Sequence, residues 1–402
     1  MKIIPITGAV QHYAWGGTDF IPKLLKKENP QQQPFAELWM GAHDRGPAQL
    51  EQSGITLNTF IANAPIKVLG EATAKRFNNR LPFLFKVLDV ANMLSIQSHP
   101  TKAQAIIGFA AENAAGIPLA APHRSFRDDN HKPEIMVALT EFWLLHGFRP
   151  AYEIEVILDK VPEFATLRPY FAQQNIYTLY EAIMYFPQET VNTLLAPLHA
   201  RLATLEPPKD TPDYWAKKAF QDYTRDGNYD RGIFSIYLFN LVRLQEGEGI
   251  FQAAGVAHAY LEGVNMELMA NSDNVFRGGL TPKHIDVPKL LQHLVTDSVV
   301  PKILTGKLTK EGEYVYQSTA PDFELSRIEI SKEQTYMATA HTPTIFIVME
   351  GVAHVQHEGS VFERTRGQSF FVSANTIYQI STLQTACMYK ASVPMHNSSS
   401  KS

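Results

Sequence analysis

The sequence predicts a mainly β protein with an inserted helical module, and three observations support this class. Short apolar runs broken by Gly, Pro and Asn dominate residues 1–148 and return after residue 233. Such runs are typical of strands. Between them, residues 151–230 carry apolar side chains at helical spacing. The third observation is an internal repeat that begins at residues 247 and 367.

Composition narrows the class of protein. The 402 residues are 45% hydrophobic and 19% charged, which is typical of a globular chain of two or three domains. A net charge of −4, with no block of like charge, argues against nucleic acid or an anionic membrane as partner. No apolar run reaches about 18 residues and the N-terminus lacks a signal-peptide core, so we expect no membrane span and a cytoplasmic location.

The counts of histidine and cysteine constrain any metal site. The chain has 14 histidines and a single cysteine, Cys387, which excludes an intramolecular disulfide and a cysteine zinc cluster. A metal site in this chain must therefore use nitrogen and oxygen ligands.

The first and last regions contain the expected strands. In the first region they are residues 81–88 and 134–139, with an Ala-rich helix at 101–115 that stops at Gly116 and Pro118. In the last region, strands are predicted at 325–330, 344–349 and 369–372. The tail, residues 396–402, is polar and is expected to be disordered.

The helical module has three predicted helices. Ile154, Ile157, Leu158 and Val161 follow i, i+3, i+4 and i+7 spacing. Residues 191–202 repeat this stripe, although Pro197 lies inside it and is expected to kink or split the helix. Residues 214–223 form the third, weaker candidate.

The internal repeat indicates the fold of the strand regions. Residues 247–258 align without gaps to residues 367–378, each with a turn glycine, a strand, a second turn and a second strand. The pattern resembles the second motif of cupin barrels, in which a metal-binding histidine follows. The resemblance implies two cupin-like (jelly-roll) β-barrels. His258 occupies the histidine position in the first copy and Tyr378 in the second, so the second barrel is expected to lack metal.

These observations predict a division of the chain into domains. Residues 1–148 and 231–300 would form the metal-binding barrel, 149–230 the helical insertion, 301–395 the C-terminal barrel and 396–402 a flexible tail.

Three short segments contain candidate metal ligands. Gln97 and His99 are two apart, so on a strand they share a face, although a strand end closed by a proline is the simpler interpretation. Glu134 is the first residue of an apolar strand. If its carboxylate is buried it needs a cation or another partner, whereas a carboxylate exposed at the strand end does not. His258 and Tyr260 again share a face. Two imidazoles and two oxygen donors suit zinc and leave room for water or substrate.

A fourth segment, residues 264–283, is polar and contains Arg277 followed by two glycines. A guanidinium offers paired donors for a phosphate or a developing oxyanion. A solvated arginine in a surface loop is the alternative.

The four segments together resemble the type I phosphomannose isomerases, and the resemblance covers most of the chain. The matching motifs are Tyr-Ala-Trp-Gly at 13–16, Ala-Glu-Leu-Trp-Met-Gly-Ala-His at 36–43, residues 81–86, Gln-x-His-Pro at 97–100, residues 112–118, Asn-His-Lys-Pro-Glu at 130–134, residues 258–263 and residues 271–283.

The resemblance implies one zinc ion per chain, held by Gln97, His99, Glu134 and His258. It places Arg277 in the active site. It also implies a pocket lined by Trp15, Lys86, Ser95, Lys132, Tyr260, Glu267 and Lys283. Two departures, Ala257 where proline is frequent and Ser98 where a small apolar residue is frequent, remove no ligand.

The implied reaction interconverts mannose 6-phosphate and fructose 6-phosphate through a cis-enediol. The candidates for the base are Glu267, Lys132, His131 and metal-bound hydroxide. Arg277 could bind either the enediolate or the phosphate. The alternatives are a non-catalytic sugar-phosphate-binding protein and a cupin oxygenase that uses Fe(II). We expect a small sugar phosphate as the partner, with no nucleic acid, no membrane and a monomeric chain.

Overall fold

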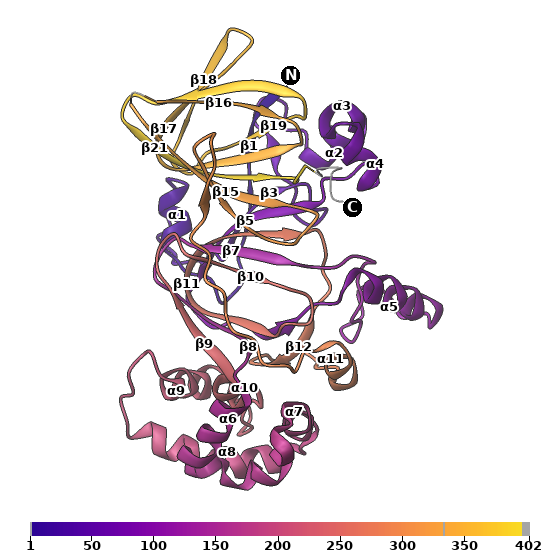
Figure 1. Cartoon of the computed structure of the whole chain (residues 1–402), viewed down its shortest axis with the longest axis vertical. Coiled ribbons are helices and arrows are strands. Elements are labelled where there is room, and N and C mark those ends of the chain that lie inside the picture. The colour runs from indigo at the N-terminus through magenta and orange to yellow at the C-terminus, as the bar shows by residue number, and fades with distance from the viewer. Residues whose placement is uncertain (1, 333, 396–402) are drawn as a thin grey trace.

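The computed structural model describes residues 2–332 and 334–395, and its strands form two antiparallel sheets. In Figure 1 the first sheet, of ten strands, occupies the middle of the molecule, the second, of eleven, the top, and the helical module the bottom. The mainly β class with inserted helices is thus confirmed.

The first sheet is built around one long strand, β11 (His258–Ala270). The first half of β11 pairs with β6 (Ile96–Ser98) and β8 (Phe142–Phe148), and the second half pairs with β5 (Phe83–Val90) and β7 (Glu134–Ala138). The remaining strands are β2 (Ala9–Gln11), β3 (Glu37–Gly41), β9 (Phe239–Leu244), β10 (Gly249–Gln252) and β12 (Phe276–Gly279). Because β11 contacts both groups of strands, residues distant in sequence meet on one face.

Strand β5 shows why the apolar strand segments of the sequence lack a polar face. Every residue of β5 is buried, because both of its faces are covered. Phe83, Phe85 and Val87 pack in the hydrophobic cluster between the two sheets, whereas Leu88 packs in a second cluster with Tyr260. Alternate side chains of one strand therefore serve two different cores.

The second sheet combines C-terminal strands with two from the N-terminal region. Its C-terminal members are β13 (Lys307–Leu308), β14 (Glu313–Tyr316), β15 (Glu324–Ser331), β16 (Thr335–Ala340), β17 (Thr344–His357), β18 (Ser360–Thr365), β19 (Ser369–Val372), β20 (Thr376–Ser381) and β21 (Thr385–Ser392). Strands β1 (Ile3–Thr7) and β4 (Gln49–Leu50) join it through β19. The predicted domain limits are not tested by this pairing and stay a prediction.

The internal repeat is visible in the backbone. Strands β10 and β19 occupy equivalent positions of the two copies. The turn glycines Gly247 and Gly367 both have φ of 84°, and the later turn residues Gly255 and Asn375 both have positive φ. Two copies with the same left-handed turns support the cupin-like arrangement.

The helices of the module are α6 (Ala151–Lys160), η1 (Pro162–Gln174), α7 (Ile176–Tyr185), α8 (Gln188–Ala203), α9 (Pro212–Tyr223) and α10 (Gly232–Leu238). Three of them, α6, α8 and α9, match the predicted ones, and three more, η1, α7 and α10, were not predicted. Outside the module lie α1 (Phe20–Leu24), α2 (Leu57–Asn63), α3 (Pro65–Leu69), α4 (Glu71–Arg76), α5 (Lys102–Ala114) and α11 (Val287–His293). None of the described helices is long and apolar enough to cross a membrane.

One helical expectation needs correction. Pro197 does not split its helix, because α8 runs unbroken from Gln188 to Ala203, while the alternative of a kink at Pro197 stays a prediction. Leu195 and Leu198 are fully buried on either side of the proline. Their packing holds both turns against the core and compensates for the backbone hydrogen bond that proline cannot donate. The expectation of a disordered tail at 396–402 lies outside the described residues.

Two glycines with similar backbone angles provide a test of the turn at the start of the repeat. At Gly367 (φ 84°), an added Cβ would lie only 1.9 Å from the carbonyl oxygen of Leu24, whereas at Gly359 (φ 80°) it would face open space. We expect Gly359→Ala to lower the free energy of unfolding by about 1 kcal/mol through backbone strain alone. Gly367→Ala should cost clearly more, measured as a shift in the urea midpoint. Equal losses would contradict the close approach to Leu24.

Candidate metal centre

Three strands bring two histidines and a glutamate to one buried point. His99 directly follows β6, Glu134 opens β7 and His258 opens β11. Their residues are 0%, 2% and 0% exposed. One ligand atom from each lies within 4.8 Å of the others, and this is the one such group of His, Cys, Asp and Glu among the described residues.

The two imidazole rings are held in the tautomer that a metal requires. Nδ1 of His99 lies 2.7 Å from the Asn274 carbonyl oxygen, and Nδ1 of His258 lies 3.0 Å from that of Val256. Because a carbonyl only accepts hydrogen bonds, each Nδ1 carries the proton. Each Nε2 therefore presents a lone pair, and the backbone carbonyls fix the ring orientation.

Both lone pairs point toward the Glu134 carboxylate. Nε2 of His99 lies 3.4 Å from Oε1, and Nε2 of His258 lies 3.2 Å from Oε2. Both nitrogens are buried and lack a hydrogen-bond partner. Lone pairs facing a carboxylate at this range are unfavourable unless a cation lies among them. The donor set therefore fits a divalent ion such as zinc.

The protonation states agree with this fit. Burial, followed by the nearby Lys132 ammonium, lowers the pKa of His99 to about 4. Burial opposes the charge on Glu134, but Lys132 and His99 outweigh it and hold the pKa of this carboxyl well below its usual range. Lys132 Nζ lies 3.0 Å from Glu134 Oε1. A neutral imidazole and an ionised carboxylate are the forms that bind metal.

Gln97 reaches the same face from the neighbouring strand. Its Cα is paired with that of His258 on one side and with that of Arg277 on the other. Directly opposed residues in an antiparallel pair project to the same face. Gln97 thus lies between the metal-binding group and Arg277.

A row of polar side chains continues from the metal-binding group along the inner face of the sheet. Lys86 Nζ lies 3.1 Å from Glu267 Oε1 and 3.4 Å from Glu37 Oε2. The Tyr260 hydroxyl donates to Glu267 Oε2 at 2.9 Å. Burial, together with the neighbouring Glu134 and Glu37, raises the pKa of Glu267 even though Lys86 opposes the shift. Burial disfavours the Lys86 ammonium, but Glu37 and Glu267 outweigh it and raise its pKa.

Sequence reasoning missed three polar residues in this interior. They are Glu37, which accepts from Trp39 Nε1 as well as pairing with Lys86, and the buried pair His146 and Gln252, whose Nδ1 and Oε1 are 2.7 Å apart. His146 is directly opposite His258 on β8, and Gln252 directly opposite Glu134 on β10. The available signal was a polar residue within an otherwise apolar strand run.

A group of cations lies beside Gln97. Burial and then the nearby Arg127 lower the pKa of Arg277, and burial followed by Arg277 lowers that of Lys283. Arg277 has no carboxylate oxygen within 4.0 Å in the described part of the chain. Mutually repelling, partly desolvated cations form a site suited to an anion.

The other predicted residues are placed as follows. Trp15 packs against the inner apolar cluster that contains Tyr260, and Ser95 lies in the loop directly before β6. His131, a candidate base, instead pairs with Asp322, whose Oδ2 lies 2.7 Å from Nε2. Its Nε2 is therefore engaged by a carboxylate that is not part of the metal-binding group.

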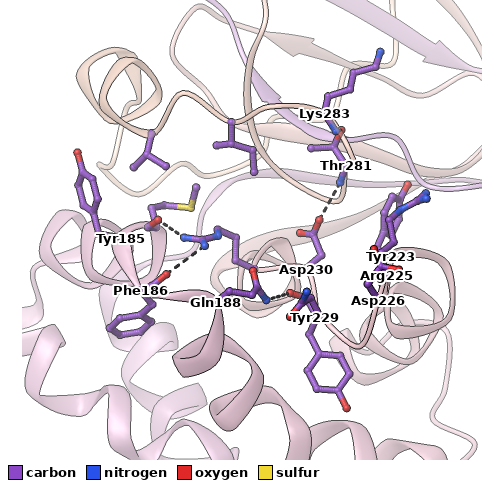
Figure 2. A pocket seen from close by; sticks show the side chains of 15 residues that line it. Tyr185, Phe186, Gln188, Tyr223, Arg225, Asp226, Tyr229, Asp230, Thr281 and Lys283 are labelled. Carbon is purple, nitrogen blue, oxygen red and sulfur yellow. Dashed lines mark hydrogen bonds between the residues drawn. The ribbon is translucent and has the colours of Figure 1, made fainter. Parts of the chain in front are cut away.

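A separate cavity of about 560 Å³ lies at the seam between the helical module and the segment after β12 (Figure 2). Thr281 and Lys283 line it on one side, and Tyr229 and Asp230 on the other. The helical module thus touches the segment that carries part of the cationic group.

Comparisons with known proteins identify the family that this chain resembles. The model of the family "Phosphomannose isomerase type I, catalytic domain" matches residues 3–151. The mannose-6-phosphate isomerase of Escherichia coli K12 is 37% identical over 378 residues, covering 92% of this chain and 94% of that one. The human mannose-6-phosphate isomerase is 34% identical over 412 residues, covering 93% and 94%.

Solved structures give the same result at the level of the fold. The mannose 6-phosphate isomerase of Salmonella typhimurium, crystallised with fructose 6-phosphate and zinc, superposes with a TM-score of 0.88 at 34% identity. The alignment covers 98% of this chain and 100% of that one.

Replacement of a predicted ligand tests the metal-binding group. We expect His258→Ala to lose the zinc that the unaltered chain retains after dialysis, because one of three buried donors is removed. The zinc content measured by plasma mass spectrometry decides this. His123→Ala, at an exposed histidine, should keep its zinc. Unchanged zinc in His258→Ala would exclude His258 as a ligand.

Proposed function

The chain belongs to the type I phosphomannose isomerase family, and we propose that Gln97, His99, Glu134 and His258 hold the zinc ion with which it interconverts mannose 6-phosphate and fructose 6-phosphate. The observation that carries this proposal is the pair of buried imidazole lone pairs aimed at one buried carboxylate. Three of the four proposed ligands meet there, and Gln97 lies on the adjoining strand.

The reaction moves a hydrogen between two neighbouring carbons of the open sugar chain. The proton leaves C2 of the aldose while the C1 oxygen gains one, which gives an enediol. A proton is then added to C1 and one is lost from the C2 oxygen. Zinc, when bound, supplies Lewis acidity toward the oxygens on these two carbons.

We assign the proton transfer to Glu267. It is buried, its pKa is raised, and it shares hydrogen bonds with Lys86 and Tyr260. A carboxylate with a raised pKa is a better base near neutral pH. The rival candidates are Lys132, which is paired with Glu134, His131, which is paired with Asp322, and metal-bound hydroxide.

We assign Arg277 to the negative charge that develops on the enediol oxygens, because its strand position is directly opposite Gln97. Lys283 is exposed and lies further along the same segment, so we assign it to the phosphate. Trp15, which packs against the apolar cluster that contains Tyr260, and Ser95, which directly precedes β6, complete the proposed pocket.

We propose that the chain is a monomer and that it acts in the cytoplasm in mannose metabolism, supported by its composition and by its resemblance to the family.

Metal removal tests the proposed function directly. In an assay coupled to fructose 6-phosphate formation, we expect turnover of mannose 6-phosphate to fall to background with chelator and to return with added zinc. A folded, zinc-loaded chain without turnover would contradict the isomerase function and leave sugar-phosphate binding alone as the alternative.

The pH profile tests the role of Glu267. A raised pKa means that the basic carboxylate is lost as the pH falls, at a pH above the ordinary glutamate value of 4.5. We therefore expect kcat to decline on the acid side with a midpoint above 4.5, and Glu267→Gln to lower kcat by about 10²-fold or more. In that variant the acid decline should also disappear. Retention of the same acid decline in Glu267→Gln would assign the base to another group.

A further inference from the structure

Asp230 connects the helical module to the strand that carries Arg277. Its Oδ1 accepts hydrogen bonds from the backbone N–H groups of Gly232 at 2.7 Å and Leu280 at 2.8 Å. Its Oδ2 accepts from Thr281 N–H at 3.1 Å, a bond that Figure 2 shows crossing the seam. One carboxylate thus fixes two consecutive peptide groups just after β12.

The backbone at this junction is crowded. A Cβ on Gly279 would lie 2.4 Å from the Cα of Gly232, so the module and β12 touch through two glycines. Gly279 has φ of 138° and Leu280 has φ of 51°, which is a left-handed conformation for a non-glycine residue. Such conformations persist only where surrounding contacts hold them.

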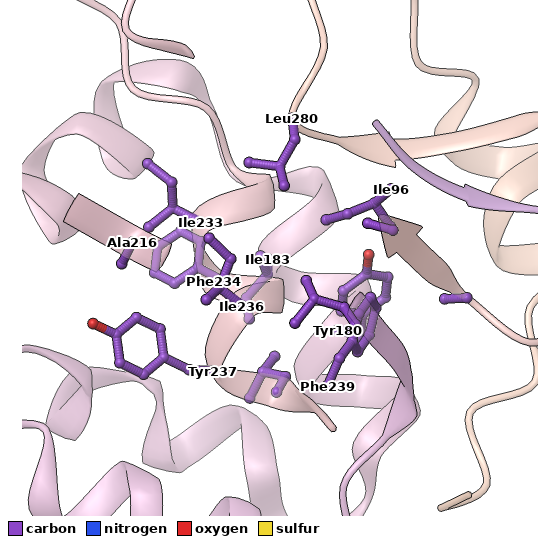
Figure 3. Close-up of a cluster of buried hydrophobic side chains, with 14 of the residues drawn as sticks. Ile96, Tyr180, Ile183, Ala216, Ile233, Phe234, Ile236, Tyr237, Phe239 and Leu280 are labelled. Atoms are coloured by element: carbon purple, nitrogen blue, oxygen red, sulfur yellow. The ribbon is translucent and has the colours of Figure 1, made fainter. Parts of the chain in front are cut away.

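The side chain of Leu280 provides one of those contacts. It is 1% exposed and belongs to the hydrophobic cluster shown in Figure 3, with Ile233 from the module and Ile96 from β6. Ile96 directly precedes Gln97. The cluster therefore packs the module, the end of β12 and the strand of a proposed zinc ligand together.

The register of β12 depends on the same junction. Arg277 is paired with Gln97, but the next pair, Gly279 with Ile96, follows a register shift. A slip of this bulge by one residue would turn Arg277 to the other face of the sheet. Asp230 holds the residues directly beyond the bulge, so it fixes the register on that side.

No hydrogen-bond or ion-pair partner among the described residues holds the Arg277 guanidinium from the other direction. Within residues 2–332 and 334–395, its guanidinium has neither a carboxylate oxygen within 4.0 Å nor a protein hydrogen bond. Its placement in this part of the chain therefore rests on the backbone of β12.

We propose that Asp230 is a positioning residue of the isomerase, holding Arg277 in register opposite Gln97. The inference rests on the proposed function. It makes the helical module part of the active-site architecture, because the carboxylate that fixes β12 comes from the loop between α9 and α10 of that module.

A double-mutant cycle tests this role. We compare Asp230→Ala, Arg277→Ala and the double variant by zinc content, melting temperature, kcat, KM and the calorimetric affinity for fructose 6-phosphate. Asp230→Ala should keep its zinc and lose at least about tenfold in kcat/KM. The loss should divide between kcat and KM in the same ratio as it does in Arg277→Ala. A general loss of stability would not reproduce that ratio.

The informative measurement is the effect of Asp230→Ala once Arg277 is gone. If Asp230 acts through Arg277, the second substitution should change kcat/KM by no more than about twofold in the Arg277→Ala background. An undiminished effect in that background, or wild-type kinetics in Asp230→Ala, would overturn the inference. An inactive wild-type chain would instead overturn the proposed function.

Two asparagine variants provide a matched control. They also keep the inference testable if Asp230→Ala folds poorly. Asp230→Asn retains one carbonyl acceptor but presents an amide N–H to the Thr281 N–H, so it should lose part of the activity. Asp226→Asn makes the same chemical change at an exposed wall of the seam cavity and should stay within about twofold of wild type. Equal kinetics in the two asparagine variants would count against Asp230.

Discussion

The buried carboxylate of Glu134 is the constraint on which the rest of the site depends. It lies at the start of a strand, almost without exposure, with an imidazole lone pair facing each of its oxygens. Burial of such a charge is strongly unfavourable unless cations surround it. Lys132 supplies one positive charge, and the donor geometry provides for a second in the form of zinc. The long strand β11 makes this possible because it pairs with β6, which His99 directly follows, and with β7, which begins at Glu134.

From this point the chemistry is arranged along strands in two directions. On the inner face, Glu267 lies between Lys86 and Tyr260, where burial and like charge keep its pKa raised. Across β6, Arg277 lies opposite Gln97 and next to other cations. Backbone pairing therefore connects both the proposed proton-transfer group and the proposed anion-stabilising group to the proposed zinc site. Asp230 connects this arrangement to the helical module through its hydrogen bonds to the backbone beyond β12.

The sequence predicted the secondary structure well but could not predict how distant segments assemble. Each of Gln97, His99, Glu134 and His258 had a local signal, yet only the resemblance to a family joined them, because spacing does not reveal that β11 pairs with both β6 and β7. The split expected at Pro197 does not occur, because tertiary packing outweighed a local rule. Asp230 gave no signal, since two of its partners are backbone N–H groups some 50 residues away in the chain. Polar residues bonded to remote backbone have no sequence pattern of their own.

Diffraction from crystals grown with zinc, with anomalous data collected at the zinc absorption edge, tests the central claim most directly. Our account predicts one anomalous peak per chain, bound by Nε2 of His99, Nε2 of His258, the Glu134 carboxylate and the side-chain amide of Gln97. A principal peak held by other residues, or one at this point without His258 or Glu134 among its ligands, would contradict it.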